Sequence, residues 1–126
     1  MNNLLNSLMP VSRFLLAFIF LMAGVSKITG YAGTEAYMAS AGVPGILLPL
    51  VILLEILGAI SLIIGYKVRW SAPALAIFCI VSALIFHFNF ADQIQSIMFM
   101  KNLAIAGGLL ALAANGAGAW SLDNRA

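Results

Sequence analysis

Long apolar stretches alternate with short polar segments along the chain, a pattern that predicts helices able to cross a lipid bilayer. A spanning helix needs about 20 mainly apolar residues to cross roughly 30 Å of hydrocarbon. Four stretches come close to this length, and we predict spanning helices at about residues 9–28 (perhaps from Leu4), 46–65, 72–88 and 97–114. The expected fold class is all-α, an integral membrane four-helix bundle.

The connections between these stretches predict which way the helices face. Lys67 and Arg69 lie in the short connection of residues 66–71, and basic residues in short loops stay on the cytoplasmic side. Both termini are then cytoplasmic, whereas residues 29–45, expected to be a loop, and residues 89–96 face outward. The polar tail of residues 121–126 is expected to be frayed.

A secretory signal peptide is the alternative interpretation of residues 1–30. The sequence disfavours it, because no side chain before Arg13 is charged, no clear A-x-A cleavage site follows, and Lys27 falls where small residues are required.

Composition narrows the class of protein. Hydrophobic residues make up 63% of the 126 residues and charged residues only 8%, whereas a soluble domain has roughly 25% charged residues. The net charge of +2 forms no basic stripe, so no nucleic-acid partner is expected. A single cysteine, Cys79, excludes an internal disulfide. Because the composition is that of a membrane protein, the lipid bilayer is the main expected partner.

Charged residues inside predicted spans are costly and mark functional sites by default. The sequence has four of them: Arg13, Lys27, Glu55 and Lys101. Helical spacing places Arg13 and Lys27 on one face of the first span, and small residues beside the charges would let the helices approach. We predict five glycines as helix-packing positions: Gly24, Gly58, Gly65, Gly107 and Gly108.

Depth suggests how the charges pair. Glu55 lies near the middle of its span, so we predict Arg13 as its counter-ion from the inner side, with Lys27 and Lys101 as alternatives from the outer side. The excess of cations would favour an anionic or carbonyl-bearing ligand. Plainer interpretations stay open, because Arg13, Lys27 and Lys101 suit interfacial anchors and Glu55 suits a purely structural ion pair. No metal site is expected, since His87 has no second ligand at a matching spacing.

Several short motifs, taken in order, resemble a known family. They are Arg13-Phe14-Leu15-Leu16, Gly24-Val25-Ser26-Lys27, Gly42-Val43-Pro44, Glu55-Ile56-Leu57-Gly58, His87 closing the third span, and Lys101-Asn102-Leu103-Ala104 followed by Gly107-Gly108. Together they resemble the DoxX family of small four-helix membrane proteins over about residues 10–115. The resemblance implies a single DoxX-like membrane domain over residues 1–126, located in the bacterial inner membrane, in a family tied to membrane oxidoreductase systems that include a thiosulfate:quinone oxidoreductase.

These observations leave three functional hypotheses. The first is a membrane subunit of a quinone-linked oxidoreductase system, in which Lys101 or Lys27 polarises a quinone carbonyl and Glu55 or His87 handles protons, with Asn102 in the same polar network. No intrinsic cofactor is expected, because the chain has no Gly-rich nucleotide loop and no cysteine cluster. The others are a non-catalytic scaffold for partner enzymes and, less favoured, a small-solute or ion conduit, which a single four-helix unit could form only as a homo-oligomer. No catalytic residue can be assigned from the sequence.

Overall fold

The computed structural model describes residues 3–125, which fold into helices with no strand among them. The elements are α1 (Asn3–Thr29), α2 (Tyr31–Ser40), the 3-10 turn η1 (Gly45–Leu47), α3 (Leu48–Ile64), α4 (Val68–Phe86), α5 (Gln93–Asn115) and α6 (Leu122–Arg125). Four segments are long and apolar enough to span a membrane: α1, η1 with α3, α4 and α5. The prediction of an all-α chain with four spanning helices is confirmed.

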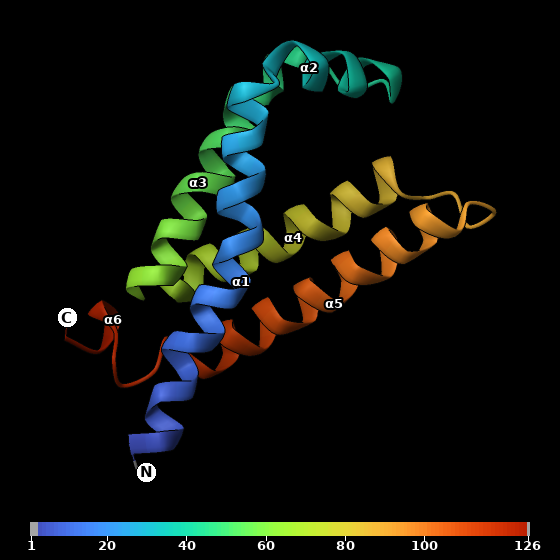
Figure 1. The fold of residues 1–126 in the computed structure, drawn as a ribbon. Helices are drawn as coiled ribbons and strands as arrows, with labels where there is room; N and C mark the ends of the chain where they lie inside the picture. Colours follow the sequence, from blue (N-terminus) through green and yellow to red (C-terminus); the bar gives the residue numbers. More distant parts are fainter. Residues whose placement is uncertain (1–2, 126) are drawn as a thin grey trace.

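The four long helices form two pairs, α1 with α3 and α4 with α5 (Figure 1). The pairs meet where α3 turns into α4 and diverge toward the other end, where α2 extends sideways over the gap. The core lies where the pairs meet, and Ala59, Leu62, Leu75 and Leu109 are fully buried there. Small and branched residues at this junction let four helices pack closely, whereas the diverging ends leave a space between the pairs.

Caps and turns explain where the helices begin and end. The carboxylate of Asp92 accepts hydrogen bonds from the backbone N–H groups of Ile94 (2.9 Å) and Gln95 (3.4 Å), so α5 starts at Gln93 rather than near residue 97. Gly65 ends α3 in a left-handed conformation with φ of 71°, which glycine adopts without steric cost. The observed spans thus differ from the predicted ones by a few residues at their ends.

Two sequence predictions about the connections are wrong. Residues 29–45 are not simply a loop, because they contain the ten-residue helix α2. The C-terminal tail is not frayed within the described residues, since it forms α6 and returns to the α3–α4 turn. There the Asp123 carboxylate accepts hydrogen bonds from the backbone N–H groups of Lys67 (2.5 Å) and Val68 (3.0 Å), which caps α4 and starts it before residue 72.

Candidate functional site

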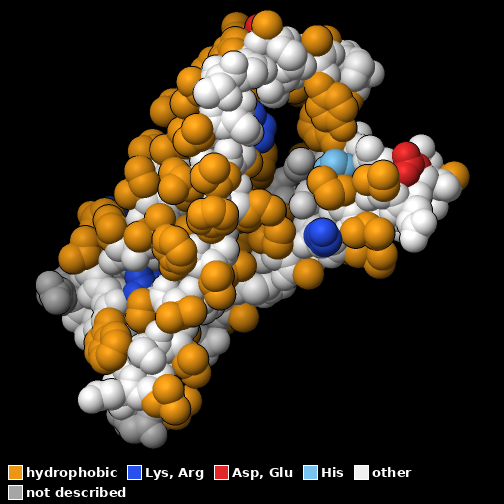
Figure 2. All heavy atoms as spheres, viewed as in Figure 1, with side chains coloured by type: hydrophobic (Ala, Val, Ile, Leu, Met, Phe, Trp, Pro, Cys, Tyr) orange, Lys and Arg blue, Asp and Glu red, His pale blue; other side chains and the backbone are white. Residues whose placement is uncertain are grey.

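A cavity of about 470 Å³ lies between the diverging helix pairs, beneath α2. Figure 2 shows the opening, with the side chain of the one histidine at its rim. The walls are mainly apolar and come from all of the four long helices and α2. The polar side chains that line it are Lys27, Thr34, Tyr37, Glu55, Ser82, His87 and Asn102. Four of the six predicted network residues, Lys27, Glu55, His87 and Asn102, are therefore brought together in one place.

An ion pair between α1 and α3 forms the charged part of the cavity wall. Lys27 Nζ lies 2.8 Å from Glu55 Oε1, and the Glu55 side chain is 3% exposed whereas that of Lys27 is 25% exposed. The separation of 2.8 Å is short enough for a charge-assisted hydrogen bond as well as an ion pair. The carboxylate is thus held inside the protein while the ammonium faces the cavity.

The close approach of α1 to α3 positions this pair. A Cβ atom at Gly24 would lie 2.6 Å from Ile56 Cγ1 and 3.5 Å from Glu55 Cβ, so a larger residue would force the two helices apart. Gly24 lies one turn before Lys27 on the same face of α1. The glycine therefore brings Lys27 within reach of the carboxylate.

His87 and Asn102 hold fixed positions on the opposite side of the cavity. His87 Nδ1 is 2.7 Å from Gln95 Oε1, which links the end of α4 to the start of α5. Asn102 Nδ2 donates to the carbonyl oxygen of Cys79 at 3.3 Å. Cys79 itself is buried in the core and lines the cavity. Residues 3–125 contain no cluster of His, Cys, Asp and Glu side chains suited to a metal ion.

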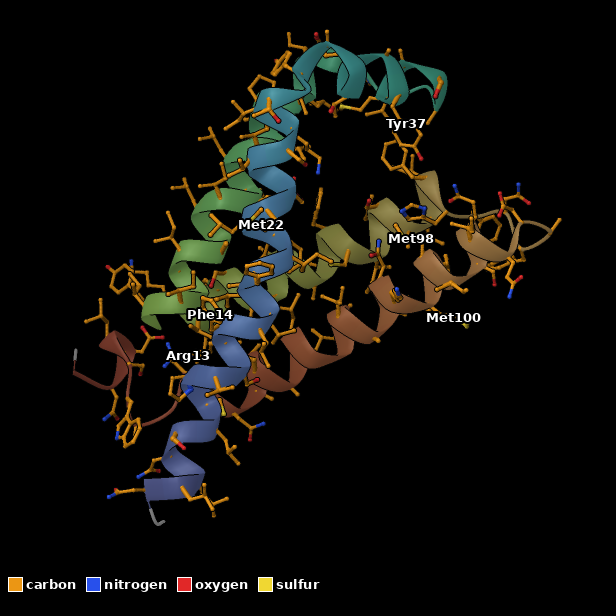
Figure 3. The ribbon with its side chains drawn as sticks, viewed as in Figure 1. Arg13, Phe14, Met22, Tyr37, Met98 and Met100 are labelled. Carbon is orange, nitrogen blue, oxygen red and sulfur yellow. The ribbon has the colours of Figure 1, made fainter. Side chains whose placement is uncertain are left out.

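Arg13 does not pair with Glu55, so the predicted counter-ion was wrong. Its side chain is 1% exposed and donates hydrogen bonds to the carbonyl oxygens of Leu62 (3.1 Å), Ile63 (3.2 Å) and Trp120 (2.5 Å). Leu62 lies seven residues beyond Glu55, which is roughly 10 Å along the helix. A cation at the C-terminal end of a helix satisfies free carbonyl groups and the helix dipole. Arg13 therefore caps the C-terminal end of α3 and links the C-terminal segment to it. Figure 3 shows the position of Arg13.

Lys101 lies outside the cavity as well. Its side chain is exposed on α5, is not among the lining residues, and has no ion-pair partner within residues 3–125. The neighbouring Asn102 faces the cavity instead, because one residue along a helix rotates the side chain by about 100°. The sequence therefore identified the turn of α5 that faces the cavity, but it could not show that Asn102 rather than Lys101 points into it.

The five predicted packing glycines differ in their surroundings. A Cβ atom at Gly58 would lie 3.0 Å from the Leu75 side chain of α4, and one at Gly108 would lie 3.4 Å from Leu16 of α1. Gly65 lies against Arg13 and Ser121 at the end of α3. Gly107 has no atom within 4 Å of that position, so it packs against no helix of the described chain.

Sequence reasoning missed the residues that α2 and α4 contribute. Thr34 and Tyr37 were placed in a loop, although Tyr37 points from α2 toward the end of α4, where its ring stacks on Phe86 with centroids 5.2 Å apart (Figure 3). Ser82 also lines the cavity and had a detectable signal, because it lies three residues after Cys79 and shares a helix face with it. The sequence carries no comparable signal for Tyr37.

Comparisons with known proteins agree with the helical architecture. A family model described as DoxX matches residues 8–88. The chain is 51% identical over 113 residues to inner membrane protein YqjF of Escherichia coli (strain K12), which covers 90% of this chain and 87% of that protein. It is 35% identical over 125 residues to inner membrane protein YphA of the same organism, covering 94% and 89%. No solved structure matches the chain.

Proposed function

The chain belongs to the DoxX family and is a multi-pass protein of the bacterial inner membrane, and from that premise we propose that it is a membrane subunit of a quinone-linked oxidoreductase system. The quinone head group would bind in the cavity beneath α2. The observation that supports this proposal most directly is the Lys27–Glu55 ion pair in the wall of an otherwise apolar cavity within the membrane-spanning part of the chain.

The residues around the cavity suit the chemistry of a quinone head group. Small-molecule sites are mostly apolar clefts of roughly 300–1,000 Å³ with a few placed polar groups, and this cavity of about 470 Å³ has that character. A quinone presents carbonyl oxygens, which accept hydrogen bonds from an ammonium or an amide N–H. Lys27 supplies the ammonium and Asn102 the amide, while Phe20 and Phe78 offer apolar walls for the ring.

Each polar residue then has a distinct task. A bound quinone accepts two electrons and two protons, with the electrons supplied by a soluble or membrane oxidoreductase partner. Lys27 donates a hydrogen bond to a carbonyl oxygen, and Glu55, 2.8 Å away, holds the ammonium in position. His87 is half-buried at the rim, where it can exchange protons between the cavity and the water outside the membrane.

Equilibrium binding of a short-chain quinone to the protein in lipid nanodiscs tests the proposal. Lys27→Met should weaken binding at least tenfold, a change of about 1.4 kcal/mol. Lys101→Met is the matched control, because it removes the same charge from an exposed position outside the cavity, and it should bind as the wild type does. Wild-type affinity in Lys27→Met, or equal loss in both variants, would rule out the cavity as the quinone site.

The other two hypotheses have less support. A conduit needs a path through the bundle, but Leu62, Leu75 and Leu109 are fully buried below the cavity and fill that region. A non-catalytic scaffold does not need an ion pair in a cavity wall. It predicts that the wild type and Lys27→Met recruit the same partner enzymes while neither binds quinone. Absence of quinone binding in both proteins, together with recovery of the same partners in mild detergent, would favour the scaffold.

A further inference from the structure

A second concave site lies at the opposite end of the molecule from the quinone cavity. It has a volume of about 490 Å³. Lys67 of the α3–α4 turn and two residues in the first turn of α4, Arg69 and Trp70, face the loop of residues 116–118 across it. Here α3 ends at Ile64, α4 begins at Val68 and α5 ends at Asn115. Because the ends of three spanning helices meet at this level, the site lies at a membrane surface. We call it the basic pocket.

The two cations of the basic pocket have no anionic partner in the described chain. Among residues 3–125, the one carboxylate that lines it belongs to Asp123, and it already accepts hydrogen bonds from the backbone N–H groups of Lys67 and Val68. No acceptor for the Arg69 guanidinium occurs among residues 3–125. Within residues 3–125, the Lys67 ammonium lies over the Tyr66 ring, whose centroid is 5.5 Å away.

The backbone around the pocket holds the cations in place. The Arg69 guanidinium lies against the loop, since a Cβ atom at Gly116 would be in ordinary van der Waals contact with Arg69 Nη2 at 3.5 Å, and Gly116 itself adopts a positive φ of 82°. Lys67 adopts φ of 53°, an uncommon conformation for a residue with a side chain, and the hydrogen bond to Asp123 maintains it. The positive charges of Lys67 and Arg69 therefore lie on an ordered turn and on the first turn of α4, rather than on a frayed loop.

We propose that the basic pocket binds the phosphate of an anionic phospholipid head group. A guanidinium binds a phosphate with two parallel hydrogen bonds, and an ammonium adds a second charge contact. Trp70 is 79% exposed beside the pocket, a position typical of tryptophan at the level of lipid head groups. Ile77, two turns further along α4, is 62% exposed and offers an apolar surface to acyl chains. A lipid matches both the charged pocket and the apolar surface below it, whereas a free phosphate ion would use only the charges.

Basic residues at this position also suit the simpler task of fixing membrane orientation. That task requires charge but no defined arrangement, so it predicts no lipid held at a saturable site. The pocket predicts a saturable site with a preference for one head-group charge, and this difference can be measured.

Native mass spectrometry of the full chain, released from detergent with defined lipids, measures that preference. Wild type should retain phosphatidylglycerol in preference to phosphatidylcholine. Arg69→Gln should lower phosphatidylglycerol retention about fivefold, as expected for one basic group near a membrane surface, and Arg69→Gln with Lys67→Asn should lower it further. Asn is chosen at position 67 because it tolerates a positive φ. Lys101→Gln removes the same charge elsewhere and should behave as the wild type.

Three results would overturn the proposal. The first is equal retention of the two lipids by the wild type, and the second is equal loss in Arg69→Gln and Lys101→Gln. The third is displacement of phosphatidylglycerol by millimolar inorganic phosphate, which would identify a free phosphate site. The single variant Arg69→Gln changes an exposed side chain that makes no hydrogen bond within residues 3–125, so it keeps the test valid even if the double variant does not fold.

Discussion

Glu55 illustrates how the sequence can identify a candidate functional residue while leaving several candidates for its partner. An acid in the middle of an apolar span must be paired or face a cavity, and the structure places it against Lys27 beside a cavity. The predicted partner Arg13 instead donates to two carbonyl oxygens near the end of α3 and to that of Trp120 in the connection before α6. Free carbonyl groups at helix ends compete for cations, and the positions of those ends depend on the tertiary structure.

The Lys27–Glu55 pair allows a prediction that separates binding from packing. Glu55→Gln leaves the Lys27 charge without its counter-charge, and should lower the free energy of unfolding by roughly 3 kcal/mol. The double variant Lys27→Met with Glu55→Leu replaces both charges by apolar groups and should recover most of that stability. Titration with SDS, followed by circular dichroism, measures both values.

In the double variant Lys27→Met with Glu55→Leu, the affinity for quinone should stay low even though the free energy of unfolding recovers. The double variant lacks the ammonium that donates to a carbonyl oxygen, so its affinity for a short-chain quinone should remain at least tenfold below that of the wild type, about 1.4 kcal/mol weaker. A double variant that is stable and binds quinone normally would show that the pair only holds the helices together.

At the scale of elements, the four spanning helices were predictable and α2 was not. Long runs of apolar residues identify a span regardless of its neighbours, and only the ends were displaced, where Asp92 and Asp123 provide caps. Helix α2 has ten residues, of which only Met38 is buried, so no periodic apolar face marks it in the sequence. Its place over the cavity depends on contacts such as the stacking of Tyr37 on Phe86, which join distant parts of the chain.

Two glycines in spanning helices make a matched pair for testing how α1 and α3 pack. Gly24→Ala adds a methyl group 2.6 Å from Ile56 Cγ1, and should lower the free energy of unfolding by about 1–3 kcal/mol through overpacking. Gly107→Ala adds the same group in open space and should raise it by up to about 1 kcal/mol, since alanine favours a helix. SDS titration of both variants is the measurement. Equal effects would contradict the close α1–α3 contact.

At the scale of the whole molecule, the two helix pairs place two different sites at opposite ends. The pairs diverge at the α2 end, where the cavity beneath α2 lies, and meet at the other end, beside the basic pocket. Figure 1 shows this divergence of the helix pairs. Apolar patterning shows which face of each helix is buried, but it contains no information about how two pairs incline to each other. The cavity as a volume could therefore not be predicted, although four of its polar residues were.

The orientation of the molecule in the membrane gives a further prediction. Lys67 and Arg69 in a short connection should keep the basic pocket and both termini in the cytoplasm. Green fluorescent protein fused to the C-terminus should therefore fluoresce, whereas alkaline phosphatase fused there should be inactive because it requires export. Active phosphatase at the C-terminus would reverse the assignment and place the basic pocket outside.

Photolabelling with a photoreactive short-chain quinone, followed by peptide mass spectrometry, tests the central claim most directly. The account predicts that labels concentrate on cavity residues such as Phe20, Phe78 and Met98, and that Lys27→Met removes this labelling while Lys101→Met does not. Labels spread evenly over exposed apolar residues such as Leu15, Leu57 and Leu110, with no effect of Lys27→Met, would contradict a quinone site in the cavity.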